Sequence, residues 1–463
     1  MNWLQTQLEK NPSKIYIQER KNTYSYLDIA EMVHAYSQAL LREGVKVHDR
    51  ALIYLPCNVT MIEIILSCFE IGVIAIPIST NLTPIELDRI IKTLRPRIII
   101  SNWEGRKKIK QQSFTIACIE ELIISSSGCS IIQNSYKKNL KDVCAIILTS
   151  GTSGTPKAVQ LTYQNFVTSC NNWNEFLEFQ SEDQFLCCLP LYHIGGFAVL
   201  IRALLYGFSV NLMQDFEEKN IHNTIEKYPV TIISLVPTML KRILDIKEGL
   251  SSLKSLRHIL LGGGPCPKYL LDLCIKEQLP IIKVYGMTET CSGTFGLKLL
   301  EEPENMHYAG RPFPGVKFWI DNNEIHISGL MVMKGYFGEE EVQGQHNSHD
   351  LGYIKDDLLF LDIRRKDLIV SGGENINPIE VEECLINVDG IIDAVVVGKK
   401  DDRLGQKVIA YIVKTSTFKG KKYVQNELKK ILSSYKIPKD YISVPQIPRN
   451  EIGKINYDKL DFL

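Results

Sequence analysis

Short apolar segments alternate with amphipathic segments over roughly the first 300 residues of the chain. Apolar runs of this length, bounded by turn residues, are typical of buried strands. The predicted helices include 28–43 and 85–94, and the predicted strands are 50–56, 73–78, 97–101, 143–150, 230–237 and 256–263. This alternation predicts parallel sheets covered by helices, in which binding sites lie beyond the carboxyl ends of the strands.

The pattern changes twice after this region. Residues 315–362 contain short apolar segments such as KFWID, EIHIS and LLFLD, which predict a small antiparallel barrel or sheet. Strand and helix patterns resume after the basic run RRKD (364–367), in DAVVVGKK, KVIAYIVK and YVQNELKKILSSY. We therefore expect an α/β chain with a large N-terminal domain (1–365) of parallel-rich sheets, helices and this small barrel. A small, mobile α+β C-terminal domain (366–463) follows, and the short joint near Lys366 is predicted to act as a hinge rather than a tether.

The most apolar stretch of the chain, 61–78, has nearly the length of a membrane span. Glu63 and Glu70 interrupt it, and Gly72 breaks it near the middle. A charged side chain at the centre of a bilayer is costly, so we interpret the stretch as a buried helix followed by a strand.

The overall charge and the cysteines narrow the class of protein. Lys and Arg total 53, as do Asp and Glu, so nothing in the net charge favours binding to nucleic acid or to an anionic membrane surface. The twelve cysteines are scattered without a C-x-x-C pair, which predicts reduced thiols. The first residues, MNWLQTQLEKNPSK, lack the apolar core of a signal peptide, so we expect a cytoplasmic protein.

A loop rich in Ser, Thr and Gly follows the predicted strand 143–150 and precedes a helix predicted from about Thr162. Its glycines allow close backbone approach, and its hydroxyls, N–H groups and lysine offer donors to phosphate oxygens. It is not a Walker loop, because Gly154 is followed by Thr-Pro-Lys rather than directly by Lys. Taken alone, such a loop can also be a simple polar turn. The candidate phosphate-binding residues are Thr149, Ser150, Gly151, Thr152, Ser153, Gly154 and Lys157.

The segment TSGTSGTPK (149–157) resembles the phosphate-loop signature of the acyl-adenylate-forming superfamily, which contains acyl-CoA synthetases, adenylation domains of nonribosomal peptide synthetases and firefly luciferase. Six further motifs that resemble those of this superfamily follow in the expected order, across nearly the whole chain. They are LPLYH (189–193), GGGP (262–265), YGMTET (285–290), Asp350 with RRKD (364–367), SGGEN (371–375) and PRNEIGK (448–454).

The resemblance implies a nucleotide site. The resemblance implies that the ring of Tyr285 stacks on adenine. It also implies that the Thr288 hydroxyl holds a phosphate and the Glu289 carboxylate holds Mg²⁺, both just beyond the end of a strand. Without the motif, Tyr285 would be a core residue and the other two would be exposed loop residues. The glycines implied to pass close to the nucleotide are Gly262, Gly263, Gly264 and Gly286.

Asp350 and Arg364 resemble the residues that contact the ribose in this superfamily. The local sequence departs from the pattern here, because the usual Thr-Gly-Asp is replaced by Ser348-His349-Asp350 and the preceding QGQHN lacks the usual aromatic residue. The final glycine of the phosphate loop is also replaced, by Ala158. Nucleotide affinity or loop geometry could therefore differ from the pattern.

Lys454 resembles the catalytic lysine of adenylation, although the segment alone would read as a solvated surface lysine. A long, flexible ammonium can bridge the attacking carboxylate and the α-phosphate. By resemblance, the C-terminal domain rotates about Lys366, withdraws Lys454 and presents a thiol route beside Gly372 and Gly373. His193 would gate this route; a core or helix-capping histidine is the alternative.

These motifs imply an AMP-forming ligase that uses ATP, Mg²⁺ and coenzyme A to convert a carboxylic acid into an acyl-AMP and then a thioester. The motif wording is most similar to bacterial o-succinylbenzoate–CoA ligases of menaquinone biosynthesis, with medium-chain or aryl acyl-CoA synthetases next. The acid should lie near His193, Gly195, Gly196, Gly262–Gly264 and 290–293. Such a dicarboxylate needs a cation, for which Arg202 is a candidate and a surface arginine the alternative.

Two other classes stay open. A stand-alone adenylation enzyme that charges a carrier protein would share every motif, and the lack of a carrier domain in the sequence favours free CoA. A nucleotide-binding regulator without activity is suggested by Ser348-His349-Asp350, but the presence of Glu289, Asp350, Arg364 and Lys454 argues against it. The expected partners are small molecules, with no nucleic acid and no membrane; a homo-oligomer is neither predicted nor excluded.

Overall fold

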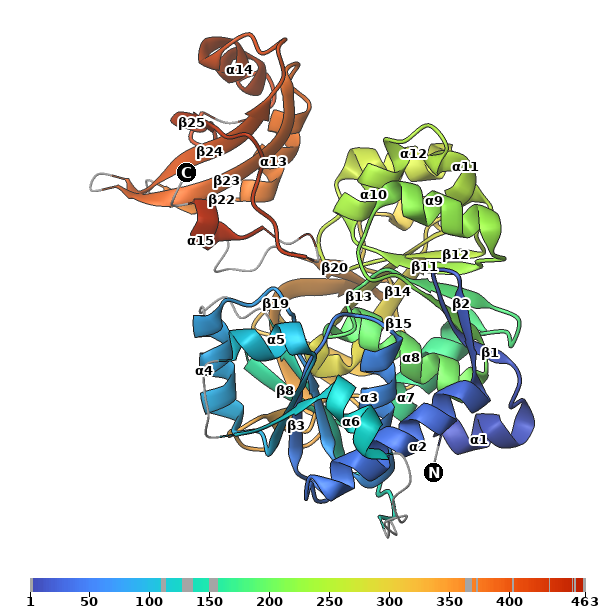
Figure 1. Ribbon diagram of the computed structural model, residues 1–463. Coiled ribbons are helices and arrows are strands. Elements are labelled where there is room, and N and C mark those ends of the chain that lie inside the picture. Colours follow the sequence, from blue (N-terminus) through green and yellow to red (C-terminus); the bar gives the residue numbers. More distant parts are fainter. Residues whose placement is uncertain are drawn as a thin grey trace.

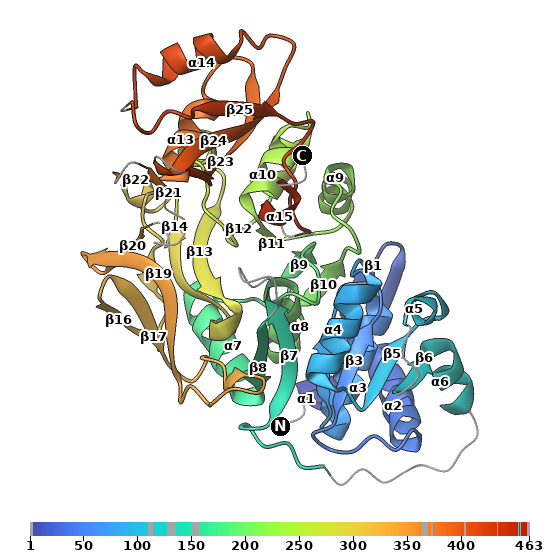
Figure 2. The ribbon, with the colours of Figure 1, turned by 90° about the vertical axis from the view of Figure 1, so that its left-hand side faces the viewer.

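The computed structural model describes residues 3–109, 114–126, 136–149, 157–362, 369–371, 374–401, 404–432, 434–451, 453 and 455–460. Within these residues the strands form four sheets, of nine, seven, four and five strands. The first three sheets and their helices make up a large N-terminal part. The last sheet belongs to a separate C-terminal unit, coloured orange to red, which lies above this part in both ribbon views (Figures 1 and 2).

The nine-stranded sheet has a parallel centre and antiparallel edges. Its order is β15-β14-β13-β12-β11-β9-β10-β1-β2. Parallel pairing runs from β1 to β13, while β2, β14 and β15 are antiparallel. The predicted strands 230–237 and 256–263 are confirmed as β11 and β12. The bounds are β1 Ile15–Glu19, β2 Asn22–Ser25, β9 Gln184–Cys187, β10 Ser209–Leu212, β11 Ile232–Leu235, β12 His258–Leu261, β13 Ile281–Met287, β14 Ser292–Lys298 and β15 Arg311–Pro312.

The seven-stranded sheet contains the other four predicted strands, as β3, β4, β5 and β7. Its order is β18-β8-β7-β4-β3-β5-β6. Pairing is parallel from β6 to β7 and antiparallel from β7 to β18. The bounds are β3 Arg50–Tyr54, β4 Ile74–Pro77, β5 Ile98–Ser101, β6 Thr115–Cys118, β7 Val143–Thr149, β8 Lys157–Thr162 and β18 Gly335–Tyr336.

One element here differs from the prediction. The strand β8 lies between the Ser/Thr/Gly loop and the helix α7 (Tyr163–Leu177), so the loop joins two antiparallel strands and does not enter a helix N-terminus. The predicted helix start is nevertheless right, because the Thr162 hydroxyl accepts a hydrogen bond from the N–H of Asn165 and caps α7. Val159 and Leu161 are buried on one face of β8, at the spacing of two that defines a strand.

Helices cover the faces of both large sheets (Figure 1). The two predicted helices are confirmed as α2 and α4. The bounds in the N-terminal part are α1 Trp3–Lys10, α2 Tyr26–Arg42, α3 Val59–Ile71, α4 Pro84–Leu94, α5 Trp103–Lys108, α6 Ile119–Ser126, α8 Ile194–Tyr206, α9 Glu218–Lys227, α10 Pro237–Leu244, α11 Gly249–Lys254 and α12 Lys268–Lys276.

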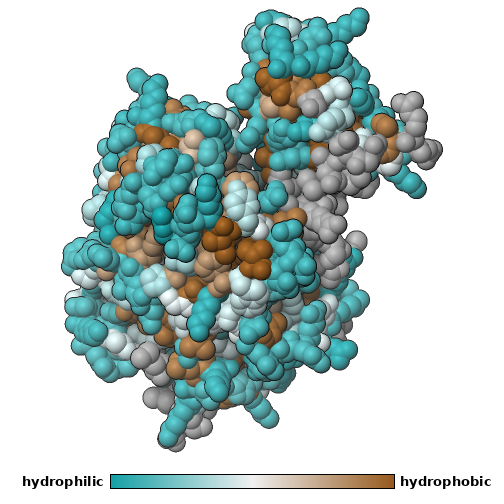
Figure 3. All heavy atoms as spheres, turned by 180° about the vertical axis from the view of Figure 1, so that it is seen from behind, coloured by the Kyte–Doolittle hydropathy of each residue, from teal (hydrophilic) through white to brown (hydrophobic). Residues whose placement is uncertain are grey.

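The apolar stretch 61–78 folds as predicted, into the buried helix α3 and the strand β4. Gly72 ends α3 with φ +75°, a left-handed conformation that favours glycine. Across the described residues, no helix combines the length and apolar character needed to cross a membrane. Most of the surface seen from behind is hydrophilic, with its hydrophobic side chains gathered in patches (Figure 3).

The predicted small antiparallel sheet is confirmed. Four strands pair antiparallel in the order β16-β17-β19-β20. The bounds are β16 Lys317–Asp321, β17 Glu324–Ser328, β19 Gln345–Lys355 and β20 Leu358–Leu361. Ile325 and Ile327 point inward from β17 and are buried in the main core of the N-terminal part.

The C-terminal unit has a core of its own, which includes Val381, Val396, Val408 and Leu428. Its sheet has the order β22-β21-β24-β23, with β25 paired to β24. The bounds are β21 Ile369–Ser371, β22 Glu374–Ile376, β23 Ile391–Asp401, β24 Gly405–Lys414, β25 Asp440–Ser443, α13 Pro378–Ile386, α14 Lys421–Leu428 and α15 Tyr457–Leu460. The predicted boundary at 365/366 lies outside the described residues and stays a prediction.

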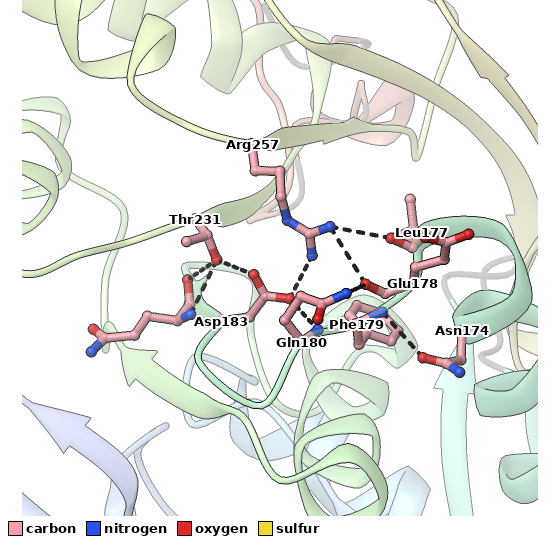
Figure 4. A network of polar contacts seen from close by, with 9 residues as sticks. Asn174, Leu177, Glu178, Phe179, Gln180, Asp183, Thr231 and Arg257 are labelled. Carbon is pink, nitrogen blue, oxygen red and sulfur yellow. Dashed lines mark hydrogen bonds and ion pairs between the residues drawn. The ribbon is translucent and has the colours of Figure 1, made fainter.

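A polar network joins α7 to the edge of the nine-stranded sheet opposite the carboxyl ends of its parallel strands (Figure 4). Asp183, which is 3% exposed, pairs with Arg257 at 2.5 Å and accepts hydrogen bonds from the Thr231 hydroxyl and the Gln180 N–H. Arg257 also donates to the last carbonyls of α7, including that of Leu177. The network fixes the end of α7 relative to β9, β11 and β12.

Candidate active site

Two of the predicted nucleotide-binding residues meet at the carboxyl end of β13. The Tyr285 hydroxyl, on β13, donates a hydrogen bond to Oδ2 of Asp350, on β19, at 2.9 Å. Asp350 is 8% exposed, and the ring of Tyr285 is half-buried. The two residues are 65 positions apart and come from different sheets. A ring face and a carboxylate side by side could contact the base and the sugar of one nucleotide.

The unusual Ser348-His349-Asp350 segment retains a hydrogen bond that fixes Asp350. The Ser348 hydroxyl donates to the Ile325 carbonyl (2.8 Å) and accepts from the N–H of Asp350 (3.1 Å). A threonine hydroxyl could make the same two bonds, so serine preserves the contact. His349 adopts φ +57°, in the left-handed region that favours glycine. The backbone therefore has the conformation that a Thr-Gly-Asp sequence would adopt, with histidine holding a position better suited to glycine.

A second group of residues surrounds Glu289, which lies in the short 3₁₀ turn Thr288–Thr290 directly after β13. The Glu289 carboxylate accepts a hydrogen bond from the Tyr336 hydroxyl at 2.8 Å, and the Lys157 Nζ lies 4.4 Å from the centre of the Tyr336 ring. Burial, and then the charge of Glu289, raise the pKa of the Tyr336 phenol, so it remains a donor. The carboxylate, phenol and ammonium thus gather at one point.

Tyr336 is a site residue that the sequence reasoning missed. It lies on β18, a two-residue strand that pairs with β8, and Tyr336 faces Val159 in this register. The signal available in the sequence was an aromatic pair after a glycine, KGYFG, which is common in turns as well as in sites. The pairing of β18 with β8 brings it to Lys157, and the Met333 N–H, which donates to the Glu289 carbonyl at 2.8 Å, holds the same segment beside Glu289.

The two ends of the predicted phosphate loop are held together by the β7–β8 pairing. Thr149 and Lys157 face each other across the two strands, and the Thr149 hydroxyl donates to the Lys157 carbonyl at 3.4 Å. The Lys157 side chain is exposed. The loop residues Ser150, Gly151, Thr152, Ser153 and Gly154 lie outside the described residues, so their predicted role stays a prediction.

Among the predicted glycines, Gly286 holds a position that a side chain could not, and Gly262 holds a tight one. A Cβ at Gly286 would lie 2.1 Å from the Ser292 carbonyl oxygen, and a Cβ at Gly262 would lie 3.0 Å from the Val284 carbonyl oxygen. Gly263 has φ +82°, and Gly264 has open space where a Cβ would be. The glycine run after β12 therefore leaves room beside β13, where Tyr285 lies.

His193 occupies the N-cap position of α8, but its side chain makes no capping hydrogen bond. Its ring centre lies 4.8 Å from that of Tyr192. Gly196 packs α8 against the preceding motif, since a Cβ there would lie 2.4 Å from the Leu189 carbonyl oxygen. His193 therefore marks the point where the LPLYH motif enters α8; the gate role stays a prediction.

Arg202, one of the candidates for contact with the acid, is buried rather than on the surface. It is 2% exposed on α8, it donates to the Ser292 hydroxyl at 2.6 Å, and its guanidinium lies 4.3 Å from the Trp173 ring centre. Its Nε has no hydrogen-bond partner, and within the described part of the chain no carboxylate forms an ion pair with it. The surface alternative is wrong, and a buried cation with spare donors remains.

The remaining predicted residues, Arg364, Lys366, Gly372, Gly373 and Lys454, lie outside the described residues. The residue before Lys454 is described: a Cβ at Gly453 would lie 2.4 Å from the Thr238 Oγ1, so this backbone packs against the start of α10. The segment that ends in Lys454 therefore reaches the N-terminal part, near the ends of β11 and β12 where the glycine run lies.

Two family models match most of the chain, and known proteins and structures match nearly all of it. The model of the family described as AMP-binding enzyme matches residues 4–337, and that of the AMP-binding enzyme C-terminal domain matches 380–454. The 2-succinylbenzoate–CoA ligase of Oceanobacillus iheyensis is 31% identical, over 98% of this chain and 97% of that protein.

Two structures of the o-succinylbenzoate CoA synthetase of Bacillus subtilis are also similar. The complex with the acyl-adenylate intermediate OSB-AMP has a TM-score of 0.91 and 30% identity, covering 99% of this chain and 97% of the other. The complex with ATP and magnesium ion has a TM-score of 0.89 and 29% identity, covering 99% of each chain. The predicted fold class is thereby confirmed, and the chain belongs to the AMP-binding enzyme family, as its ordered motifs predicted.

Proposed function

We propose that this chain is an ATP-dependent 2-succinylbenzoate–CoA ligase that acts in menaquinone biosynthesis. Full-length similarity to ligases of that name supports the proposal, as does similarity to a structure that contains the acyl-adenylate of this acid. The part of the proposal that concerns ATP binding rests on two clusters of residues around β13. One is Tyr285 with Asp350, and the other is Glu289 with Tyr336 and Lys157.

The arrangement fits ATP bound with magnesium. Magnesium is held in such sites by one or two carboxylates, with phosphate oxygens and water completing its coordination. Among the described residues there is no cluster of three or more acidic, His or Cys ligands, so a site built on Glu289 and the phosphates fits better than an all-protein cage. The ion would neutralise phosphate charge there. Glu289, oriented by Tyr336, would hold it, and the ammonium of Lys157 would contact a phosphate.

The proposed reaction has two steps. In the first, a carboxylate oxygen of the acid attacks the α-phosphorus of ATP, the bond from that phosphorus to the bridging oxygen breaks, and pyrophosphate leaves. Lys454 would place its ammonium between the attacking carboxylate and the α-phosphate, where negative charge accumulates. In the second, the sulfur of CoA attacks the acyl carbon, the thiol proton is lost, and AMP leaves with its electron pair.

Arg202 supports a dicarboxylate as the acid. A guanidinium buried among Trp173, Ser292 and the α8 backbone is costly unless a negative charge pairs with it when substrate is bound. Burial lowers the pKa of Arg202 from its usual value, but this side chain remains charged at neutral pH. Only one of the two carboxylates of 2-succinylbenzoate reacts, so the other is free to pair with Arg202.

The test is an assay of pyrophosphate release and thioester formation with a panel of acids. We expect activity with 2-succinylbenzoate and free CoA, and little with octanoate or benzoate. A preference for octanoate or benzoate would favour the medium-chain or aryl synthetases. Transfer only to a carrier protein would favour a stand-alone adenylation enzyme, and no pyrophosphate release with any acid would favour a regulator.

The Arg202→Gln variant tests the second carboxylate directly. We expect the KM for 2-succinylbenzoate to rise about 10- to 100-fold, the range expected when charged hydrogen bonds are lost. The controls are 4-oxo-4-phenylbutanoate and 2-butanoylbenzoate, each of which lacks one of the two carboxylates. Whichever analogue retains the reacting carboxylate should be converted slowly by both enzymes, with less than about a threefold difference between them. An equal loss for acid and analogue would contradict the assignment.

A further inference from the structure

The segment that leads to Lys454 makes a specific polar contact with the N-terminal part. The Glu451 carboxylate accepts hydrogen bonds from the Ser79 hydroxyl (3.2 Å) and from Nδ2 of Asn81 (2.5 Å). The two donors lie in the loop after β4, and Glu451 is some 370 positions later, in the C-terminal unit. The Ser79 hydroxyl also accepts from the N–H of Asn81 at 3.1 Å, so the donor loop is itself held in shape.

A second contact lies two residues further along. Gly453 has φ +75°, and a Cβ there would lie 2.4 Å from the Thr238 Oγ1 and 3.1 Å from a methyl group of Val236. Val236 is the N-cap of α10, and Thr238 lies in its first turn. The backbone at 453 therefore packs on the N-terminal part at a distance that only glycine allows.

The same segment is firmly attached to the C-terminal unit at its base. Arg449 and Ile455 form an antiparallel bridge, and the N–H of Asn456 donates to the Pro448 carbonyl, which closes a tight hairpin over 448–456. One guanidinium nitrogen of Arg449 donates to both carboxylate oxygens of Asp393, on β23, at 3.0 and 3.1 Å. The hairpin therefore moves with the C-terminal unit, and its tip is the part that contacts Ser79 and Asn81 (Figures 1 and 2 show this unit above the large part).

We propose that Glu451 and its partners Ser79 and Asn81 form a latch that positions Lys454 for adenylate formation. The inference rests on the proposed function, because it assigns the contact to one of the two half-reactions. Glu451 is a positioning residue here: its carboxylate contacts Ser79 and Asn81, and it acts through Lys454, three residues later in the sequence. Glu451 and Asn81 are exposed, so the bonds between them are weak enough to break each time the C-terminal unit moves away.

The test compares the two half-reactions in variants of the full chain. In Asn81→Ala and Glu451→Gln, we expect the rate of acyl-AMP formation to fall about three- to tenfold. Thioester formation from supplied acyl-AMP and CoA should change by less than about twofold, since it does not need Lys454. The loss in the double variant should be smaller than the product of the two single losses, because both substitutions weaken the same contact. The control, Glu427→Gln, removes a partly exposed carboxylate on α14 that pairs with Lys430, and should alter neither half-reaction.

A readout independent of activity separates the latch from the function. In hydrogen–deuterium exchange of the ligand-free chain, Glu451→Gln should speed amide exchange in peptides covering both 79–83 and 449–455, with other peptides unchanged. An equal loss in both half-reactions, or exchange that changes in only one of the two peptides, would overturn the latch. A wild-type chain that forms no adenylate would overturn the proposed function instead, and the exchange measurement would then decide the latch alone.

Discussion

His349 holds a left-handed backbone conformation between the two residues that anchor the candidate ribose site. Among the described residues, the ion-pair partner of its imidazole is Glu324, at a long 3.7 Å and with the histidine side chain largely exposed. This contact offsets little of the backbone strain. Asn347 steadies the turn, because its side-chain oxygen accepts from the His349 N–H at 2.8 Å. The conformation is thus imposed by neighbours rather than preferred by histidine.

Replacing His349 by glycine should therefore stabilise the protein. We expect the free energy of unfolding of His349→Gly to rise by roughly 0.5–1 kcal/mol. This is the backbone strain that glycine relieves, minus the stability lost because glycine makes the unfolded chain more flexible. Chemical denaturation measures this. The matched control is His326→Gly on β17, where the ring stacks on Trp319 and the strand needs a side chain; it should destabilise. A destabilised His349→Gly would show that the ring matters more than the backbone.

Glu63 is a buried carboxyl on α3, and its burial gives the protein a pH dependence. It is 4% exposed; loss of hydration, and then the charge of Glu19, raise the pKa of Glu63 to about 7. Between the ordinary pKa of about 4.5 and about 7, the folded state keeps a proton that the unfolded chain has released. Stability should therefore fall as pH rises through this window, and the loss should be complete above it.

The Glu63→Gln variant tests this sign. We expect a stability equal to that of the wild type near pH 4.5 and greater by about 2–3 kcal/mol at pH 8, because glutamine does not ionise. Thermal unfolding at the two pH values measures the difference. The control is Glu31→Gln, which changes an exposed carboxyl on α2. Its stability should differ from that of the wild type by the same small amount at both pH values. A Glu63→Gln effect that does not grow with pH would contradict the raised pKa.

At the scale of elements, the network around Asp183 shows why α7 ends where it does. Asp183 accepts from Arg257, Thr231 and the Gln180 N–H at once (Figure 4). Its loss would remove all three bonds and leave Arg257 and Thr231 with weaker bonds to backbone carbonyls. We expect Asp183→Ala to lower the free energy of unfolding by about 2–3 kcal/mol. This is less than the loss expected on breaking a fully buried ion pair, because the Arg257 side chain is partly exposed.

Thermal unfolding can separate this network from an ordinary surface ion pair. Asp272→Ala removes the partner of Lys268 on α12, where both side chains are about half exposed, and should cost less than about 0.5 kcal/mol. Similar losses for the two variants would mean that solvent satisfies the Asp183 partners and that the network is not what ends α7.

The strands and helices that the sequence predicted correctly are those with a strong periodic pattern. The helix 85–94 has the helical period of apolar residues, and the strand 97–101 is a short apolar run bounded by polar and turn residues. β8 was missed because Lys157–Thr162 is short and lies directly between the Ser/Thr/Gly loop and a capped helix, so it was interpreted as part of that loop. Its pairing with β7 decides the matter, and that pairing depends on residues outside the segment.

At the scale of the whole molecule, the sequence identified residues of the candidate site by motif but not their arrangement. Tyr285 and Asp350 were both expected near the nucleotide, and the hydrogen bond between them brings them together. Tyr336 and the Ser79–Glu451 contact could not be predicted, because each depends on segments brought together only by the completed fold. Residues that act through long-range contacts carry no local signature.

The placement of Lys454 on the C-terminal unit leads to the last prediction. The hairpin that carries it is attached to β23 through Arg449 and Asp393, while the nucleotide clusters lie on the N-terminal part. If Lys454 serves only the first half-reaction, Lys454→Ala should slow acyl-AMP formation by at least about 100-fold, as loss of a transition-state contact does. Thioester formation from supplied acyl-AMP and CoA should stay within about threefold of the wild type.

Rapid-quench assays of each half-reaction measure the two rates separately. Lys422→Ala, which removes an exposed ammonium from the first turn of α14, is the matched control and should leave both unchanged. Equal losses in the two half-reactions would mean that Lys454 stays at the reacting atoms throughout, and that the C-terminal unit need not move between them. A difference of two orders of magnitude between the two losses would mean that Lys454 serves acyl-AMP formation only. The C-terminal unit would then have to move between the two half-reactions.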